Sequence, residues 1–298
     1  KIPSRLTPYR VGLHMAGVLY IVATPIGNLE DVTLRALRIL KEADLIAAED
    51  TRHTKKLLAH YGIDRPLTSY HEHNEKTKAH ELVARLVRGE NVALVSDAGT
   101  PTLSDPGYRL VREAIKAGIN VAPVPGPSAL TAALSASGLA TDRFVFEGFL
   151  PAKKGERRER LSRLREETRT LIFYEAPHRL KESLGDLLEI LGDREAVLGR
   201  ELTKIYEEFI RGRLTETIAQ LDLTKPRGEI TLVVRGAGRE SAPGQELLRA
   251  EIHRLQRKGL RVKEIAELLG EKFSYSKREV YRLALENRKG HTISCSGS

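Results

Sequence analysis

The stretch Leu19-Tyr-Ile-Val-Ala-Thr-Pro-Ile-Gly-Asn28 decides the fold of this chain. Its first five residues have the apolar pattern of a buried strand, a turn containing Pro25 and Gly27 follows, and a helical pattern begins at Val32. In α/β domains a strand, a tight turn and a helix in this order place backbone groups in a crevice where ligands bind. The chain contains neither G-x-G-x-x-G nor G-x-x-x-x-G-K-[ST], so the common dinucleotide and P-loop sites are disfavoured.

The composition is ordinary for a globular protein but basic. The 298 residues are enough for two or three domains, and the formal net charge of +9 favours an anionic partner such as nucleic acid. The single cysteine, Cys295, excludes an internal disulfide and a cysteine-based metal site, and it favours a reducing cytoplasm. We expect no membrane span, because no apolar run approaches the roughly 20 residues needed, and no signal peptide, because the first residues lack an apolar core.

Strand and helix patterns alternate from Met15 onward and predict an N-terminal α/β domain over residues 15–127, with a mostly parallel sheet covered by helices. Its expected strands are Leu19–Ala23, Leu45–Ala48, Leu67–Tyr70, Val92–Ser96 and Val121–Val124. Its expected helices are Val32–Ala43, Thr54–Tyr61, Thr77–Gly89 and Tyr108–Ala117. Residues 1–14 are expected to lie outside this fold, upstream and disordered.

A second α/β domain is predicted over residues 128–238, beginning with a helix of small residues, Ser128–Leu139. The expected strands of its mixed sheet are Phe144–Phe149, Thr170–Tyr174, Ala196–Leu202, Tyr206–Arg211 and Glu229–Val234. The segment Lys153 to Arg165 carries seven lysines or arginines and two acids. Such a helix fits either a solvated face or a phosphate contact.

A linker at 236–244 precedes a small C-terminal helical unit over residues 245–290, and the tail 291–298 is expected to be unstructured. A helix, a break at Gly270 and a further helix starting near Ser276 form a helix-turn-helix layout. Basic side chains would lie on the last helix: Lys277, Arg278 and Arg282. Both a nucleic-acid contact and a plain packing or dimerisation module fit this pattern.

Polar motifs follow the predicted strands, at the edge where α/β sheets bind ligands. Glu49-Asp-Thr-Arg-His53 fits either a substrate site or a helix N-cap. The segments 96–107 and 124–129 are rich in glycine, proline and hydroxyls, which lets backbone groups approach a polar ligand. The motif His71-Glu-His73 has no convincing third ligand, so no metal is expected.

The second domain has its own polar strand ends, at 173–179, 199–204 and 226–229. Polar strand ends in both domains predict a cleft between them.

Five of these motifs, in register along the chain, resemble the tetrapyrrole methylase superfamily, and within it the branch that methylates small-subunit ribosomal RNA. They are Thr24-Pro-Ile-Gly-Asn-Leu-Glu-Asp31, Ala48-Glu-Asp-Thr-Arg52, Ser96-Asp-Ala-Gly-Thr-Pro101, Val124-Pro-Gly-Pro-Ser128 and Phe173-Tyr-Glu-Ala-Pro-His-Arg179. The resemblance implies two α/β domains of tetrapyrrole methylase type with S-adenosylmethionine bound in the cleft between them, in a cytoplasmic homodimer. It also implies 2′-O-methylation of a cytidine in the decoding centre of 16S rRNA, with free rRNA or the assembled small subunit as substrate.

The alternative is a methylase of the same superfamily that acts on a small, tetrapyrrole-like molecule. Thr100 stands where the tetrapyrrole enzymes carry aspartate, which argues for the RNA branch.

The resemblance also implies roles for individual residues. The cofactor-binding positions it implies are Ala23, Pro25, Asp97, Gly99, Thr100, Leu103, Ser128, Ala129, Tyr174, Leu202, Glu229 and Ile230. The expected RNA-binding positions are Asn28, Arg52, Arg179, Arg200, Lys153 and Lys154.

A general base that removes the 2′-hydroxyl proton would help the transfer. Lys204 is the first candidate, with Glu175 beside it, although nearby acids would raise the pKa of the lysine and leave it to hold a phosphate instead. His71 is the second candidate, because histidine titrates near neutrality.

Overall fold

The computed structural model describes residues 10–11, 14–222, 228–238, 245–272 and 275–290. The chain divides into two compact units. The larger contains both α/β sheets and comprises residues up to 164 together with 170–234. The smaller comprises residues 165–169 and the chain from 235 onward.

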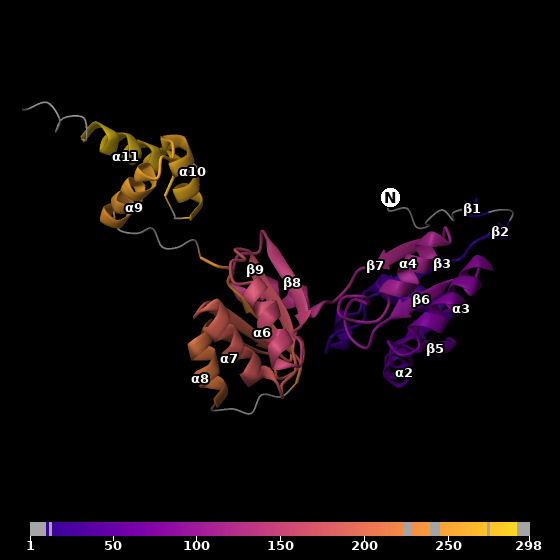
Figure 1. Cartoon of the computed structure of the whole chain (residues 1–298). Helices are drawn as coiled ribbons and strands as arrows, with labels where there is room; N and C mark the ends of the chain where they lie inside the picture. Colours follow the sequence, from indigo (N-terminus) through magenta and orange to yellow (C-terminus); the bar gives the residue numbers. More distant parts are fainter. Residues whose placement is uncertain (1–9, 12–13, 223–227, 239–244, 273–274, 291–298) are drawn as a thin grey trace, which may run out of the picture. The chain divides into compact units, whose positions relative to one another are not determined.

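The first sheet, predicted to be mostly parallel, is parallel throughout, with strand order β5-β4-β6-β3-β7. Figure 1 labels four of its strands, β3, β5, β6 and β7. Its strands are β3 (Val18–Val22), β4 (Leu45–Ala48), β5 (Leu67–Ser69), β6 (Val92–Val95) and β7 (Asn120–Val124). Its helices are α1 (Leu34–Glu42), α2 (Thr51–His60), α3 (Glu75–Val87) and α4 (Tyr108–Lys116). The sheet is covered on both faces, α1 and α2 packing on one core and α3 and α4 on the other.

The second sheet is mixed, as predicted, with strand order β11-β10-β12-β9-β8 and one parallel pair, β8 with β9. Its strands are β8 (Phe144–Phe149), β9 (Thr170–Glu175), β10 (Glu195–Arg200), β11 (Glu208–Arg213) and β12 (Ile230–Val234). The small-residue helix α5 (Ala129–Ser137) packs on one face. The other face is covered by α6 (Lys154–Arg163), α7 (Leu180–Leu191) and α8 (Leu214–Asp222).

Several element boundaries differ from those predicted, for local reasons. Helix α1 begins at Leu34 because the Thr33 side chain caps it, accepting from the Ala36 N–H at 3.1 Å. Helix α2 begins three residues before the predicted Thr54, because Asp50 caps it. Strand β10 ends at Arg200 rather than Leu202, since Glu201 and Thr203 have left-handed φ values of +51° and +66°.

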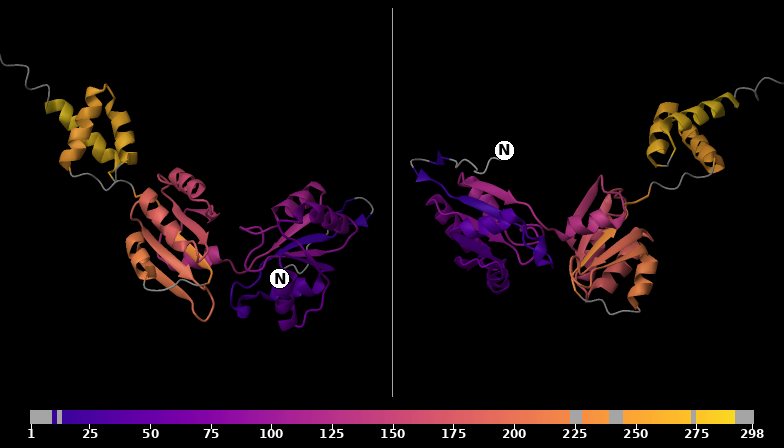
Figure 2. Two further views of the ribbon diagram at one scale, coloured as in Figure 1. Left: turned by 60° about the horizontal axis from the view of Figure 1, so that its bottom comes forward. Right: turned by 180° about the vertical axis from the view of Figure 1, so that it is seen from behind.

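The smaller unit contains three helices, α9 (Gln245–Arg257), α10 (Val262–Lys272) and α11 (Lys277–Gly290) (Figure 2). These helices share an apolar core. Residues 239–244 of the expected linker, the tail from 291 and most of residues 1–14 lie outside the described residues. Within the N-terminal segment, β1 (Arg10–Val11) pairs with β2 (His14–Met15). A short 3₁₀ turn, η1 (Leu29–Asp31), follows the first strand-end loop.

Candidate functional site

A pocket of about 310 Å³ in the larger unit is built by strand ends of both sheets. The first half of the chain contributes the loops that follow β3 and β6 and the start of α5, and the second half contributes the ends of β8 and β9 and the start of β12. Eight of the predicted cofactor positions line it: Gly99, Thr100, Leu103, Ser128, Ala129, Tyr174, Glu229 and Ile230.

The loops on the N-terminal side are tied together by backbone hydrogen bonds. Thr24 and Gly99 exchange two, the N–H of each donating to the carbonyl of the other at 2.8 and 3.0 Å. The Thr100 hydroxyl donates to the Pro127 carbonyl at 3.2 Å, which adds the loop after β7. Gly99 itself has φ +80°, a conformation that side chains rarely adopt. The pocket wall is therefore held by backbone geometry.

Tyr174 forms the opposite wall. Its phenolic oxygen accepts from the Leu130 N–H at 3.2 Å, and its ring meets Phe146 and Phe149 edge-on, with centroids 4.9 and 5.6 Å away. Burial raises the pKa of Tyr174, so the hydroxyl stays neutral at physiological pH. A flat apolar wall with a few polar groups suits the base of a nucleoside.

Asp105 is the charged residue of the pocket lining that was not among the predicted site residues. Burial raises its pKa to about 7, the negative charges of Glu49 and Asp97 add to the rise, and a hydrogen bond from Ser96 opposes it. Asp105 lies in the 96–107 loop that the composition singled out, but its environment depends on residues from other strand ends. A carboxylate here suits a cationic ligand, whose charge favours the ionised acid.

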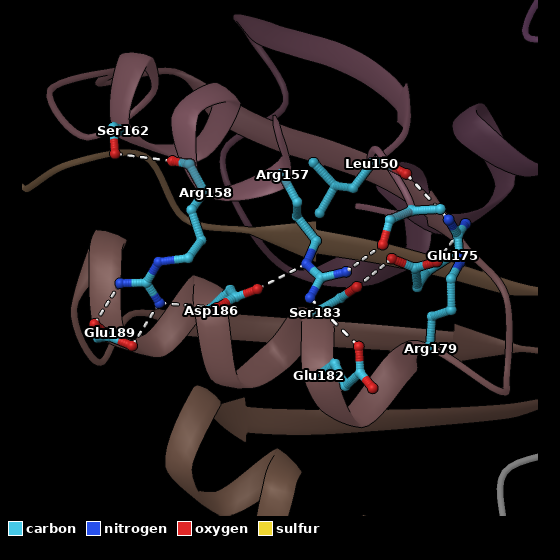
Figure 3. Close-up of polar contacts among 11 residues, drawn as sticks. Leu150, Arg157, Arg158, Ser162, Glu175, Arg179, Glu182, Ser183, Asp186 and Glu189 are labelled. Atoms are coloured by element: carbon cyan, nitrogen blue, oxygen red, sulfur yellow. Dashed lines mark hydrogen bonds and ion pairs between the residues drawn. The ribbon is translucent and has the colours of Figure 1, made fainter. Parts of the chain in front are cut away.

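Glu175 lines the pocket but is fully engaged by hydrogen bonds (Figure 3). The carboxylate is 3% exposed and accepts from Arg179 at 2.9 Å, from the Ser183 hydroxyl at 2.5 Å and from the Ala176 N–H at 2.8 Å. With both oxygens occupied, Glu175 fixes the end of β9, and Arg179 is directed toward it. This arrangement favours a positioning role for both side chains.

Lys204 lies in the turn after β10, where its ammonium contacts Glu201 at 2.9 Å and Glu229 at 3.4 Å. Partial burial works to lower the pKa of Lys204, but the two carboxylates outweigh it and the net pKa is raised. A raised pKa is the reverse of what a lysine general base needs, so the lysine is held as a cation. The Lys204 side chain reaches the first half of the chain, because a Cβ on Gly27 would lie 2.3 Å from the Lys204 Cγ.

Four predicted cofactor positions lie outside the pocket lining. Pro25 and Asp97 line a neighbouring hollow of about 260 Å³, together with His53 and Lys56. Ala23 is buried at the end of β3, and Leu202 is buried in the core beneath α5.

His71 also lies apart from both hollows. Its Nε2 is 3.2 Å from the Asn74 amide, and its buried Nδ1 has no hydrogen-bond partner among the described residues.

Most of the predicted RNA-binding cations have an acidic partner. Arg52 pairs with Asp50, Arg200 with Glu208 and Lys153 with Glu156. Lys154 is exposed at the start of α6. The Asn28 side chain caps the 3₁₀ turn by accepting from the Glu30 N–H at 3.0 Å.

The basic helix α6 is largely structural (Figure 3). Its Arg157 is 2% exposed and pairs with Asp186, itself 6% exposed, at 2.7 Å. Arg158 bridges Asp186 and Glu189 on α7. These charges fasten α6 to α7 and leave few cations on the helix for a phosphate.

Within the described part of the chain, no cluster of three or more potential ligands could hold a metal ion. None of the described helices is both long and apolar enough to cross a membrane.

Residues 18–218 match the family of tetrapyrrole (corrin/porphyrin) methylases. The chain belongs to this family. Tetrapyrrole methylase architecture is also found in the solved structures of a diphthine synthase (17% identical, covering 74% of this chain and 90% of that one, TM-score 0.56) and of uroporphyrin III C-methyltransferase from Thermus thermophilus (23% identical, 73% and 97%, TM-score 0.53).

Several curated relatives are named ribosomal RNA small subunit methyltransferase I. The protein of Synechocystis is 52% identical over 91% of this chain and 98% of its own length. That of Pseudomonas aeruginosa is 51% identical over 92% of this chain and 98% of its own length.

As a tetrapyrrole methylase, the protein uses S-adenosylmethionine as its methyl donor. The residues of the pocket fit this molecule. Tyr174 and its neighbouring aromatic rings suit the adenine, and the carboxylates of Asp105 and Glu229 suit the positive sulfonium and amino groups.

Proposed function

We propose that this methylase transfers a methyl group from S-adenosylmethionine to the ribose 2′-oxygen of a cytidine in the decoding centre of small-subunit ribosomal RNA. The observation that carries the proposal is the similarity along nearly the full length of relatives named for methylation of this RNA. The solved porphyrin enzyme, at 23% identity, shares the fold alone. The formal net charge of +9 also suits a polyanionic substrate.

The methyl donor supplies an activated methyl group, so the protein's main task is to align the ribose oxygen with it. Lys204, held as a cation by Glu201 and Glu229, is suited to hold a phosphate at the edge of the pocket. Glu175 is saturated with hydrogen bonds. His71 remains the candidate for the general base, although it lies apart from the pocket lining.

RNA contact by Asn28, Arg52, Arg179, Arg200, Lys153 and Lys154 is part of the proposal, as are the homodimer and the cytoplasmic location. Two exposed side chains among these residues, Arg52 and Lys153, would have to exchange their acidic partners for phosphate.

The test is transfer of labelled methyl groups to three substrates: small ribosomal subunits from cells that lack this protein, naked small-subunit rRNA, and a tetrapyrrole. Label at a ribose 2′-oxygen of one cytidine supports the proposal and identifies the substrate state. Label in the tetrapyrrole alone would instead support the small-molecule methylase. Label on a base rather than a ribose would contradict the 2′-O assignment.

A further inference from the structure

A groove of about 720 Å³ crosses the C-terminal helical unit, where α9 ends and α10 begins. Among its lining residues are the cations Arg257, Arg261 and Lys263, and no aspartate or glutamate lines it. The family match ends at residue 218, so this groove belongs to a part of the chain beyond the methylase domains.

The groove cations differ in their pairing from two arginines of α9, Arg249 and Arg254. On α9, Arg254 pairs with Glu251 at 2.6 Å, and Arg249 reaches Glu286 of α11 at 3.5 Å. Arg257, Arg261 and Lys263 form no ion pair with any described residue. Their charge is therefore not compensated by an ion pair, and all three line the same groove, which suits an anion.

An exposed aromatic side chain and two apolar side chains line the same groove as these charges. Tyr281 of α11 is 44% exposed at the groove, and Leu260 and Val262 are half-buried beside it. The Gln256 amide donates to the Ala284 carbonyl at 2.8 Å and joins the two helical walls. An exposed ring beside free cations is the combination by which proteins stack a nucleic-acid base while contacting its phosphates.

We infer that this groove binds single-stranded RNA, with a base stacked on Tyr281 and phosphates on Arg257, Arg261 and Lys263. The choice of a single strand follows from the ring, which can stack only on a base that is not enclosed in a duplex. The choice of RNA over DNA rests on the proposed function. The groove would hold a segment of the substrate outside the methyl-transfer pocket.

The experiment measures binding of a short fluorescent single-stranded RNA to the full-length chain as a function of salt. The test variant is R257Q/R261Q. Its matched control, R249Q/R254Q, removes the same charge from paired arginines of the same helical unit. Methyl-donor binding by calorimetry and the melting temperature are measured for every variant, to show that the larger unit and the fold are intact.

We expect R257Q/R261Q to weaken RNA binding about tenfold at low salt and to reduce the slope of log K against log salt by about 1.4, the value for two phosphate contacts on a single strand. The control should change the dissociation constant less than twofold. Y281A should weaken binding about tenfold while Y281F preserves it, because phenylalanine retains the stacking face.

Equal losses in R257Q/R261Q and R249Q/R254Q would overturn the inference, since net charge alone would then explain the binding. Wild-type binding in all groove variants would also overturn it. Groove-dependent RNA binding without methyl transfer to any RNA would support the groove and contradict the proposed function.

Discussion

The phenolic oxygen of Tyr174 accepts a hydrogen bond from the backbone N–H of Leu130 at 3.2 Å. Tyr174 lies on β9 of the second sheet, and Leu130 lies in the first turn of α5, directly after the loop that leaves the first sheet. The first N–H groups of a helix have no partner within the helix. The Tyr174 side chain therefore provides a hydrogen-bond acceptor for a free N–H group in the first turn of α5, and the same side chain lines the pocket.

Removing the Tyr174 hydroxyl should have a smaller effect than removing the ring. We expect Tyr174→Phe to lower the free energy of unfolding by about 1 kcal/mol, the net value of a typical hydrogen bond, and to weaken methyl-donor binding only a few-fold. Tyr174→Ala should weaken it much further, because the apolar wall is lost. Calorimetry and thermal unfolding measure both. Tyr206→Phe, at an exposed site outside the pocket, is the control, and unchanged affinity in Tyr174→Ala would contradict this view of the wall.

Asp105 should make methyl-donor binding dependent on pH. Because the pKa of Asp105 is raised to about 7, its carboxyl becomes ionised between about pH 6 and 8 and then attracts the cationic sulfonium. Affinity should rise over this range in the wild type and stay flatter in Asp105→Asn. The demethylated product has a neutral sulfur and should show a weaker dependence. Identical pH profiles for wild type and variant would contradict the role of this carboxyl.

Asp105 should also make the stability of the protein depend on pH. Stability should fall as the pH rises, whereas methyl-donor affinity should rise. The folded pKa of Asp105 is raised above the unfolded value, so the folded state binds more protons and stability is lost as the pH rises through about 7. Asp105→Asn, without its methyl donor, should therefore gain stability relative to wild type at pH 8 and differ little at pH 4. Chemical unfolding at the two pH values tests this, and a variant that gains only at pH 4 would reverse the sign.

The buried pair of Arg157 and Asp186 should be costly to break from one side only. Arg157→Met or Asp186→Leu alone should each cost about 3–5 kcal/mol, because a charge remains buried without its partner. The double variant should recover much of that loss, since no isolated charge is left. Urea unfolding in a double-mutant cycle measures the coupling, and additive single effects would indicate that the two charges act independently.

Lys204 should act through its charge. If it holds a phosphate, Lys204→Arg should preserve more methyl transfer than Lys204→Met, and the loss in Lys204→Met should lie in KM for the RNA. The raised pKa of Lys204 predicts no rise in kcat/KM from its deprotonation near neutral pH. A rise in rate near neutral pH that disappears in Lys204→Met would instead identify it as the base.

The sequence predicted the sheets well because each depends on local patterns. Four-residue apolar runs such as Leu45–Ala48 and Val92–Val95 are buried along their whole length. Such runs indicate parallel strands that are covered on both faces. The pocket could be located because its loops carry glycine, proline and hydroxyl residues at strand ends. The state of its charges could not be predicted, because the pKa of Asp105 depends on its burial and on Glu49, which follows a different strand, β4.

Helix α6 shows the same limit. From the sequence, its cations fitted either a solvated face or a phosphate contact. The acid that pairs with the buried Arg157 is Asp186, which lies 29 residues further along the chain. Only the packing of α6 on α7 distinguishes the two interpretations.

The paired hydrogen bonds between Thr24 and Gly99 constrain the lengths of two loops at once. Surface loops ordinarily accept insertions and deletions more readily than any other part of a protein. One residue added before Thr24 or Gly99 would displace the N–H and carbonyl groups of that residue from those of the other. Both backbone hydrogen bonds between Thr24 and Gly99 would then be lost. The spacing from β3 to Thr24, and from β6 to Gly99, should therefore tolerate changes of residue type far better than changes of length.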